Sequence, residues 1–453
     1  MLPTVKDRRE SGRALREQVP RSSHAEFTRD SSVDAVELVL SQEQGRIESL
    51  LPVRRQRMAE SAFAFYRAGA LLMATDLART PRTGILVQAS GDAHLSNFGW
   101  YGSPERALVF DANDFDETLR GAWEWDLKRL CASFVIGSQD NAFDTKSQRK
   151  AAREAVRGYQ QAMAKFASSP ALETWYAQVA TEDVLDRIRA EGRSRDLRRV
   201  EKGARKASKK DSQHVLGKLA ERVDGQYRII DDPPFVVPMR AMEFPFSIEE
   251  GEAAVRGMFA SYVESIEPAI RNLISRFRVV DIALKVVGVG SVGTRCFIAL
   301  LEGNGQEDVL FLQIKEAGRS VLEDEFGDSP YDHDGERVVQ GQRLMQTTSD
   351  ILLGWTSNAS GHHYYVRQYK DMKASPRIDK FDPDDMAKYA NVCGAVLAHA
   401  HARGGDPAEI SGYIGSNDNF ADAVTEFSLA YARQNQTDYE AFLSKVGEVS
   451  TPG

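Results

Sequence analysis

The stretch Gly91-Asp92-Ala93-His94-Leu95-Ser96-Asn97 is followed by a second, Val109-Phe110-Asp111-Ala112-Asn113-Asp114-Phe115-Asp116-Glu117. The first places an Asp and an Asn in one short loop, and the second gathers carboxylates at the end of an apolar run. Phosphoryl transfer uses an Asp that orients a hydroxyl group, together with an Asn and an Asp that hold Mg²⁺. A simpler interpretation of 111–117 is an Asp/Asn turn that caps a strand and a helix. The choice depends on whether the chain also supplies a nucleotide site.

The residues around these two stretches predict short strands that lead into helices. Ile85-Leu86-Val87 is typical of a buried strand that ends at the first stretch, and residues 107–110 predict a second strand that ends at Asp111. An apolar helix is expected from Trp123 to about residue 136, and another from about 148 to 166.

Composition excludes several classes of protein. The 453 residues are 42% hydrophobic and 27% charged, as in a globular protein of two to four domains or lobes. A net charge of −8 argues against a general nucleic-acid binder, which needs a basic surface. No apolar segment resembles a signal peptide or a transmembrane helix, so we expect no membrane partner. Cys131, Cys296 and Cys393 are too far apart for a metal motif, which makes a reducing cytoplasm the simplest location.

The N-terminal region and one later segment are rich in charge. Residues 1–35 predict an extended arm, and a helix is expected over 36–51. Arg54, Arg57 and Arg67 could contact phosphate, although a solvated helix face is the simpler interpretation. The basic segment 190–210 predicts a solvated helix or loop, with a substrate-contacting loop as the alternative.

A glycine-rich loop lies within a region rich in β-branched residues. Residues 279–315 predict a three-stranded antiparallel meander. Its first turn, Gly288-Val289-Gly290-Ser291-Val292-Gly293, has the spacing G-x-G-x-x-G. A dinucleotide-binding loop of this spacing must open a helix, whereas residues 296–301 are strand-like. Strand, glycine loop and strand favour the loop that covers ATP phosphates in kinases, with a plain glycine-rich hairpin as the alternative.

The next strand ends in a lysine. Val309-Leu310-Phe311-Leu312-Gln313-Ile314-Lys315 resembles the V-A-I-K strand of kinases. A lysine at the end of an apolar strand needs an anionic partner unless it reaches solvent. Nucleotide phosphates and a helix Glu would supply one; Glu336 is our choice, with Glu323 and Glu325 as competitors.

The first stretch resembles the H-G-D-x-H-x-x-N loop of the aminoglycoside phosphotransferase and choline kinase group. Asp114-Phe115-Asp116-Glu117 with Trp125-Asp126-Leu127 is similar to that group's I-D-F-D-D and Y-D-L-A strings. The spacing to Asp126 favours Asp114 over Asp111 as the counterpart of the metal-binding Asp. Ser90 departs from the group, which usually has His at this position.

The order of the motifs departs from that of kinases, because the glycine loop and lysine follow the catalytic loop. The resemblance therefore implies an α+β, bilobal protein-kinase-like fold in circularly permuted order, which needs only neighbouring surface ends. The expected parts are an arm and helix over 1–50, a helical lobe with the catalytic and metal loops over 51–275, a β-rich ATP-binding lobe over 276–370, and helices over 371–453 that complete the helical lobe.

Nearly the whole chain also resembles a bacterial family, domain of unknown function 2252, which names no substrate. The resembling strings are Pro52-Val53-Arg54, Arg57-Met58, Phe63-Ala64-Phe65-Tyr66-Arg67, Gly91-Asp92-Ala93-His94, Asn97-Phe98-Gly99, Asn113-Asp114-Phe115-Asp116-Glu117, Trp123-Glu124-Trp125-Asp126-Leu127-Lys128-Arg129, Arg337-Val338-Val339 and Gly341-Gln342-Arg343.

These features together predict an ATP- and Mg²⁺-dependent phosphotransferase that acts on a small hydroxylated or amino acceptor. Asp92 would orient the acceptor hydroxyl, and His94 would contact phosphate or acceptor or be structural. Asn97 and Asp114 would hold Mg²⁺, and Asp116 or Asp111 could add a ligand. The expected nucleotide contacts are Gly288, Gly290, Ser291 and Gly293 over the phosphates, Lys315 on the α- and β-phosphates with Glu336 as its partner, and Tyr365 and Arg367 in a hinge beside adenine.

Three other functions fit parts of this pattern. The same site could transfer AMP to a protein hydroxyl, or the chain could be a nucleotide-binding pseudokinase with a regulatory role. Metal-assisted hydrolysis by the carboxylates of 111–117 alone would leave the glycine loop and Lys315 unexplained.

Overall fold

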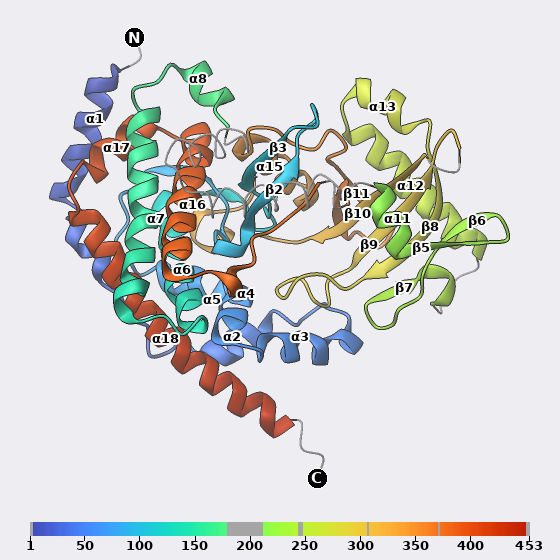
Figure 1. Cartoon of the computed structure of the whole chain (residues 1–453), viewed down its shortest axis with the longest axis horizontal. Helices are drawn as coiled ribbons and strands as arrows, with labels where there is room; N and C mark the ends of the chain where they lie inside the picture. Colours follow the sequence, from blue (N-terminus) through green and yellow to red (C-terminus); the bar gives the residue numbers. More distant parts are fainter. Residues whose placement is uncertain (1–2, 179–211, 243–247, 306–307, 370–371, 450–453) are drawn as a thin grey trace.

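The computed structural model describes residues 3–178, 212–242, 248–305, 308–369 and 372–449. It is a mixed α and β structure with antiparallel sheets. Figure 1 shows helices gathered on one side of the molecule and the largest sheet, with its own helices, on the other. The basic segment 190–210 lies outside the described residues. In the described ranges, no helix is both long and apolar enough to cross a membrane.

The largest sheet has six antiparallel strands in the order β11-β12-β10-β9-β8-β7. Its strands are β7 (Val236–Pro238), β8 (Arg278–Lys285), β9 (Cys296–Glu302), β10 (Val309–Ala317), β11 (Gly354–Ser357) and β12 (His363–Gln368). The predicted meander is confirmed, because β8 pairs with β9 and β9 pairs with β10. The register places Lys315 between Cys296 and Tyr365.

Helices that precede the sheet in sequence cover both of its faces. Alternate residues of β9 and β10 belong to two different apolar clusters, as the two-residue period of a strand requires. One face packs on α12 (Ile248–Ser265) and α13 (Pro268–Ile274), and the other on α11 (Ser212–Leu219) and the β5–β6 hairpin. Residues from 212–242 and 248–274, which we expected in the helical lobe, thus contribute to the two apolar clusters on the sheet. Helical periodicity shows that a helix has an apolar face but not which core that face joins.

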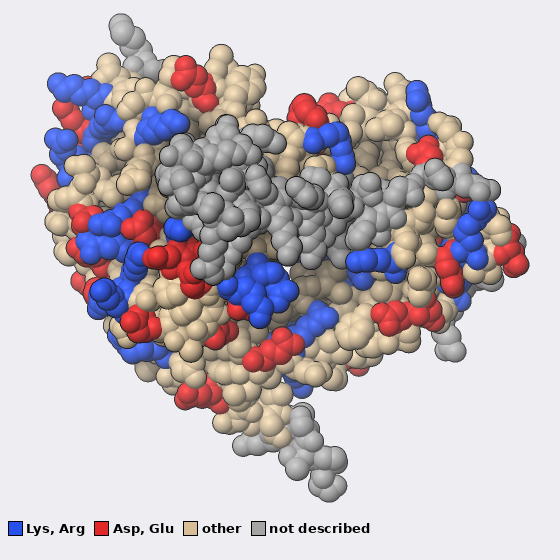
Figure 2. All heavy atoms as spheres, in the orientation of Figure 1, with Lys and Arg blue, Asp and Glu red and all other residues tan. Residues whose placement is uncertain are grey.

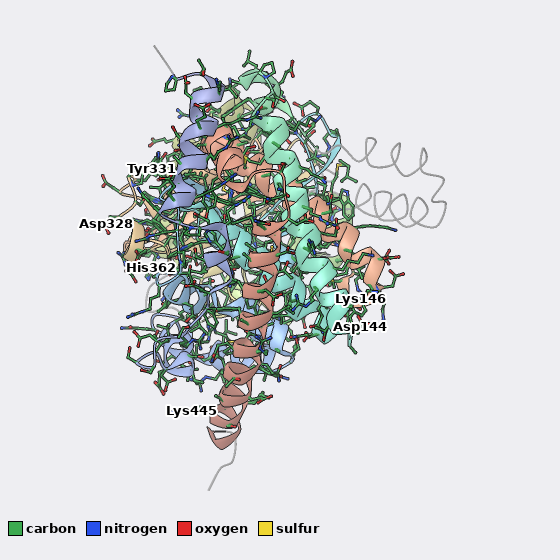
Figure 3. All side chains as sticks on the ribbon, turned by 90° about the vertical axis from the view of Figure 1, so that its left-hand side faces the viewer. Asp144, Lys146, Asp328, Tyr331, His362 and Lys445 are labelled. Atoms are coloured by element: carbon green, nitrogen blue, oxygen red, sulfur yellow. The ribbon has the colours of Figure 1, made fainter. Side chains whose placement is uncertain are left out.

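The helical part is built around α6 (Trp123–Asp140) and α7 (Thr145–Phe166). The C-terminal helices α16 (Pro383–Gly404), α17 (Pro407–Ile414) and α18 (Asn419–Val449) share their core. As predicted, Asp382 caps α16 and Pro383 is its first residue. A Cβ atom at Gly394 of α16 would lie 2.0 Å from the carbonyl oxygen of Ala155, so only glycine allows α7 and α16 to approach this closely. Figure 3 shows α7, which starts near the labelled Asp144 and Lys146, and α18, which ends near Lys445.

The N-terminal residues are helical, and the predicted extended arm is wrong. Helix α1 (Val5–Ala14) packs on α17, where Arg8 forms an ion pair with Asp406 (3.0 Å). The remaining helices are α2 (Ala35–Ser41), α3 (Leu51–Met58), α4 (Ala62–Ala68), α5 (Ala70–Leu77), α8 (Ala171–Tyr176), α14 (Glu323–Phe326) and α15 (Asp334–Met345). The remaining strands are β1 (Leu86–Ala89), β2 (Phe98–Gly102), β3 (Leu108–Ala112), β4 (Leu119–Ala122), β5 (Ala220–Val223) and β6 (Gln226–Ile229).

Candidate functional site

The loop 91–97 connects β1 to β2 and is fixed by helix α6. The carboxylate of Asp126 accepts hydrogen bonds from the backbone N–H groups of Ser90 (2.6 Å) and Gly91 (2.9 Å). Gly91 has φ +75°, and a Cβ atom there would lie 2.6 Å from the carbonyl oxygen of Glu117. Glycine is therefore required, and it brings the first stretch directly against the second. Ser90 contributes here through its backbone, which does not need the His that the resembled group has.

Asp92 is held by one of its two carboxylate oxygens. Arg129 on α6 contacts Oδ1 through Nε (2.6 Å) and Nη2 (2.5 Å). Oδ2 lies 3.8 Å from Nε2 of His94, and the side chain is 22% exposed. Burial raises the pKa of Asp92 to about 6, although Arg129 opposes this change. The free oxygen is thus an oriented acceptor whose pKa is close to that of a useful general base.

His94 is a neutral hydrogen-bond donor beside Asp92. Its Nδ1 accepts a hydrogen bond from the backbone N–H of Ser96 (3.2 Å), so the proton of the neutral ring is on Nε2. Burial lowers the pKa of His94 well below its usual value, and the charges of Arg67 and Arg129 lower it further. The ring is therefore not an additional cation but a directed N–H group.

The pairing of the two stretches places Asn97 beside Asn113, the residue before Asp114. The backbone N–H of Asn113 donates to the carbonyl oxygen of Asn97 (3.0 Å), and the amide of Asn97 donates to the carbonyl oxygen of Asp92 (2.9 Å). Within the described residues, Oδ1 of Asp114 is buried without a hydrogen-bond partner. Burial opposes ionisation of Asp114, but the charges of Lys315 and other nearby cations prevail and lower its pKa to about 2.

An ionised carboxylate with a buried oxygen that accepts no hydrogen bond fits a bound cation. No group of three or more His, Cys, Asp or Glu side chains suited to a metal ion is found among the described residues. Asn97 and Asp114 would therefore need further oxygen ligands from a substrate, and phosphate oxygens are suitable ones for Mg²⁺.

Lys315 pairs with the second stretch rather than with a helix glutamate. Its Nζ donates to Asp116 and lies 3.7 Å from Oδ1 of Asp114, and the side chain is only 5% exposed. The hydroxyl of Tyr365 donates to Oδ1 of the same Asp116 (2.8 Å). In the described part of the chain, the predicted pairing of Lys315 with Glu336 is not formed. The reason is geometric: the lysine at the end of β10 reaches the carboxylates of 114–116 directly.

Helix α15 contributes an arginine instead of a glutamate. Arg337 is buried and donates to the carbonyl oxygens of Thr118 (2.6 Å), Asp116 (2.8 Å) and Gly318 (2.7 Å). It thereby joins the second stretch to the end of β10. Sequence reasoning missed this residue, because an arginine that binds carbonyl oxygens leaves no local pattern.

The remaining acidic residues of the second stretch have structural partners. Asp111 accepts hydrogen bonds from the backbone N–H groups of Ala112 (2.8 Å) and Thr347 (3.2 Å), and burial raises its pKa to about 7. Glu117 accepts from the N–H of Val321 (2.8 Å). Asp116 accepts hydrogen bonds from Lys315 and Tyr365, whereas Oδ1 of Asp114 accepts none within the described residues and has Lys315 at 3.7 Å.

The glycine loop is held by its carbonyl groups. Arg46 donates to the carbonyl oxygens of Gly290 (2.8 Å) and Val292 (2.7 Å), and Arg57 donates to that of Gly288. The backbone N–H of Ile47 donates to the carbonyl oxygen of Gly293 (2.8 Å).

The amide groups of the same loop are available. Among the described residues, the N–H groups of Gly288, Val289, Gly290, Ser291 and Gly293 donate no hydrogen bond. Successive free N–H groups in a turn form a binding site for anions.

A cavity of about 590 Å³ lies between the glycine loop and the second stretch. Cationic side chains outnumber anionic ones in its wall; the cationic ones are Arg106, Lys285, Lys315, Arg367 and Lys373, and the anionic ones are Asp114 and Asp350. Gly288 and Ser291 also line it. Figure 2 shows the hollow between the two sides of the molecule, with Lys and Arg atoms around it.

Some predicted site residues lie outside the wall of this cavity. Gly293 packs on Arg46, and Gly290 lies over the backbone of Arg67. Tyr365 faces Asp116, whereas Arg367 lines the cavity and donates to Gln313 (2.9 Å). Glu336 donates its backbone N–H to His333 at the start of α15.

The fold and the site define an α+β protein with a cationic cavity between a glycine loop and the second stretch; Asp92 and Asn97 of the catalytic loop do not line this cavity. The model of the family described as "Uncharacterized protein conserved in bacteria (DUF2252)" matches residues 46–445. The chain therefore belongs to this family, and the matched range includes every element of the site. No curated protein and no solved structure matches the chain.

Proposed function

We propose that the protein is an ATP- and Mg²⁺-dependent phosphotransferase that acts on a small hydroxylated or amino acceptor. One observation carries this proposal: Gly288 and Ser291, whose N–H groups donate no hydrogen bond within the described residues, line one cavity together with Lys315 and Asp114. Lys315 and its partner Asp116 are 199 residues apart in sequence. A structural hairpin would not need N–H groups without an acceptor beside a cavity whose wall is cationic.

The order of the elements supports a permuted kinase-like fold. Strand β8, the glycine loop, β9, the lysine strand β10, helix α15 and strands β11 and β12 follow one another as in the ATP-binding lobe of kinases. The catalytic loop comes earlier in the chain, and α16 to α18 return to the helices that carry it.

The cavity suits a nucleotide in size and in wall chemistry. A volume of about 590 Å³ is within the range of small-molecule sites. Its cations suit a triphosphate, and Tyr101, Val286, Val287 and Ile351 offer apolar contact for a base. Asn97 and Asp114 would hold Mg²⁺, which neutralises phosphate charge when it is bound.

In the proposed reaction, Oδ2 of Asp92 accepts the hydrogen of the acceptor hydroxyl and orients its oxygen toward the γ-phosphorus. The bond from this oxygen to phosphorus forms as the bond to the β,γ-bridging oxygen breaks, and ADP leaves with the electron pair. The acceptor proton passes to Asp92 and then to solvent. His94 donates its Nε2–H to the phosphate or to the acceptor, while Lys315 and the loop amides hold the phosphates. Catalysis of this class depends on positioning and on charge stabilisation.

Transfer from labelled ATP tests the proposal. Wild type and Asp92→Asn are incubated with Mg²⁺ and a panel of hydroxylated and amino metabolites, once with γ-labelled and once with α-labelled ATP. We expect label from the γ-position in a small product, and none with Asp92→Asn. Label from the α-position on protein would instead establish AMP transfer. ATP binding without any transfer across the panel and a cell lysate would favour the regulatory pseudokinase.

A further inference from the structure

Arg67 is a mostly buried arginine in helix α4. Its Nε is fully buried, and within the described ranges the side chain forms no hydrogen bond and no ion pair. The buried Arg54 pairs with Glu43 (3.1 Å), and Arg129 pairs with Asp92. Removing a cation from water without a compensating anion costs free energy, so buried charges are normally paired. The exception at Arg67 points to an anion that arrives with a ligand.

Helix α4 directs Arg67 toward the catalytic loop. Residues four apart lie on the same face of a helix, and Phe63 packs against His94 with ring centroids 6.3 Å apart. The neighbouring Tyr66 fixes the helix on α6, because its hydroxyl donates to the carbonyl oxygen of Arg129 (2.7 Å). Arg67 therefore faces the same loop as Phe63.

The glycine loop passes close to Arg67, and two carboxylates of the site interact with its charge. A Cβ atom at Gly290 would lie 3.6 Å from the carbonyl oxygen of Arg67, so the loop passes over the end of α4. The charge of Arg67 acts on both Asp92 and Asp114. The charge of Arg67 is thus close enough to act on the proposed base and the proposed metal ligand, and the phosphate-binding loop passes over the backbone of the same residue.

We infer that Arg67 is a catalytic residue that binds the phosphoryl group while it passes from ATP to the acceptor; this inference rests on the proposed function. The N–H groups of Arg67 would donate to the non-bridging oxygens of the γ-phosphoryl group, and no bond to Arg67 forms or breaks. The planar guanidinium matches the geometry of phosphate, and its charge stabilises the charge that develops on the transferred group.

A mimic of the transferred group separates this role from a structural one. MgADP is titrated into wild type, Arg67→Ala and Arg67→Lys with and without aluminium fluoride, which occupies the position of the phosphoryl group. We expect all three to bind MgADP within about twofold of one another, because Arg67 does not hold ADP. Aluminium fluoride should tighten binding to wild type about 100-fold and to Arg67→Ala hardly at all, as expected for loss of one charged contact to a transition state.

Control variants distinguish loss of the contact between Arg67 and the phosphoryl group from other effects of the substitution. Arg120 is exposed on β4, and Arg120→Ala should respond to aluminium fluoride as wild type does. Arg67→Lys keeps the positive charge of the side chain. Guanidinium added to the solution should restore part of the tightening by aluminium fluoride that Arg67→Ala loses. Equal tightening in wild type and Arg67→Ala, or no tightening in a wild type that binds MgADP, would overturn the role of Arg67. Failure of wild type to bind MgADP at all would instead overturn the proposed function.

Discussion

The catalytic loop 91–97 and the glycine loop 288–293 serve the same proposed site but are held in opposite ways. Asp126 and Arg129, both on the nearby α6, fix the catalytic loop from within about 40 positions of sequence. The glycine loop is fixed by Arg46 and Arg57, which are 244 and 231 positions from their acceptors.

The two loops also differ in what they leave available. In the catalytic loop, most polar groups are engaged, and one oxygen of Asp92 stays open. In the glycine loop the carbonyl oxygens are engaged, and a run of amides stays open. The comparison indicates that the catalytic loop is a self-contained unit, whereas the glycine loop depends on the N-terminal segment. Arg46 and Arg57 thus support the site from the N-terminal segment.

The largest effect is expected from Asp92→Asn. The substitution removes the proton acceptor but leaves the cavity intact, so turnover should fall by at least about 100-fold while ATP affinity stays within a few-fold. Initial rates and calorimetric titration measure the two quantities. Asp111→Asn is the matched control, because Asp111 has structural partners only. Loss of ATP binding in Asp92→Asn would mean that the loop holds the nucleotide rather than the acceptor.

The next largest effect is expected from Lys315→Met. The lysine is both the cation nearest to the proposed phosphates and the partner of Asp116, so its loss should weaken ATP binding about 10- to 100-fold. Calorimetry measures the affinity, and Lys218→Met on the exposed surface of α11 is the control. An unchanged affinity would restrict Lys315 to a structural ion pair.

The pH dependence of turnover should report Asp92. Its carboxylate must be ionised to accept a proton, and burial raises its pKa to about 6. Activity should therefore be constant at higher pH and fall about tenfold per pH unit below about pH 6. A pH–rate profile measures this, and Asp111→Asn should leave its midpoint in place. A midpoint that moved with Asp111→Asn would assign the titration to that residue.

A moderate effect is expected from Arg46→Gln. The substitution removes charged donors from two loop carbonyl groups, so hydrogen exchange should accelerate over 288–293 but not over 91–97. ATP affinity should fall about three- to tenfold. Arg8→Gln, which breaks an ion pair at the far end of the helical part, is the control. Equal exchange in both loops of Arg46→Gln would contradict the separate anchoring of the two loops.

The smallest effect is expected in the number of protons that the protein takes up when ATP binds. Burial and the nearby charges of Arg367 and Lys315 lower the pKa of Lys373 to about 7, so at pH 8 it is mostly neutral. A bound polyanion would raise this pKa, and up to about one proton should be taken up per ATP. Calorimetry at pH 8 in buffers of different ionisation enthalpy measures the uptake. Lys373→Met should abolish it; uptake that persists in this variant would assign it elsewhere.

The same contrast explains what sequence could and could not predict. Asp92, Asn97 and Asp114 are close in sequence, and the arrangement of the stretches that carry them follows from two short paired strands. The meander and the start of α16 also depend on local signals. Lys315 was identified from its own strand, but its partner was not, because Asp116 lies 199 positions earlier. Arg337 and Arg46 bind carbonyl oxygens, which every residue has, and so their roles leave no pattern in sequence.

Calorimetric titration of ATP, with and without Mg²⁺, into wild type and Asp114→Ala tests most directly whether the distant parts form one nucleotide site. We predict a single site in wild type that binds more tightly with Mg²⁺, and a loss of this Mg²⁺ response in Asp114→Ala. An unchanged response in the variant would show that Asp114 does not hold the metal. No binding of ATP to wild type would contradict the account.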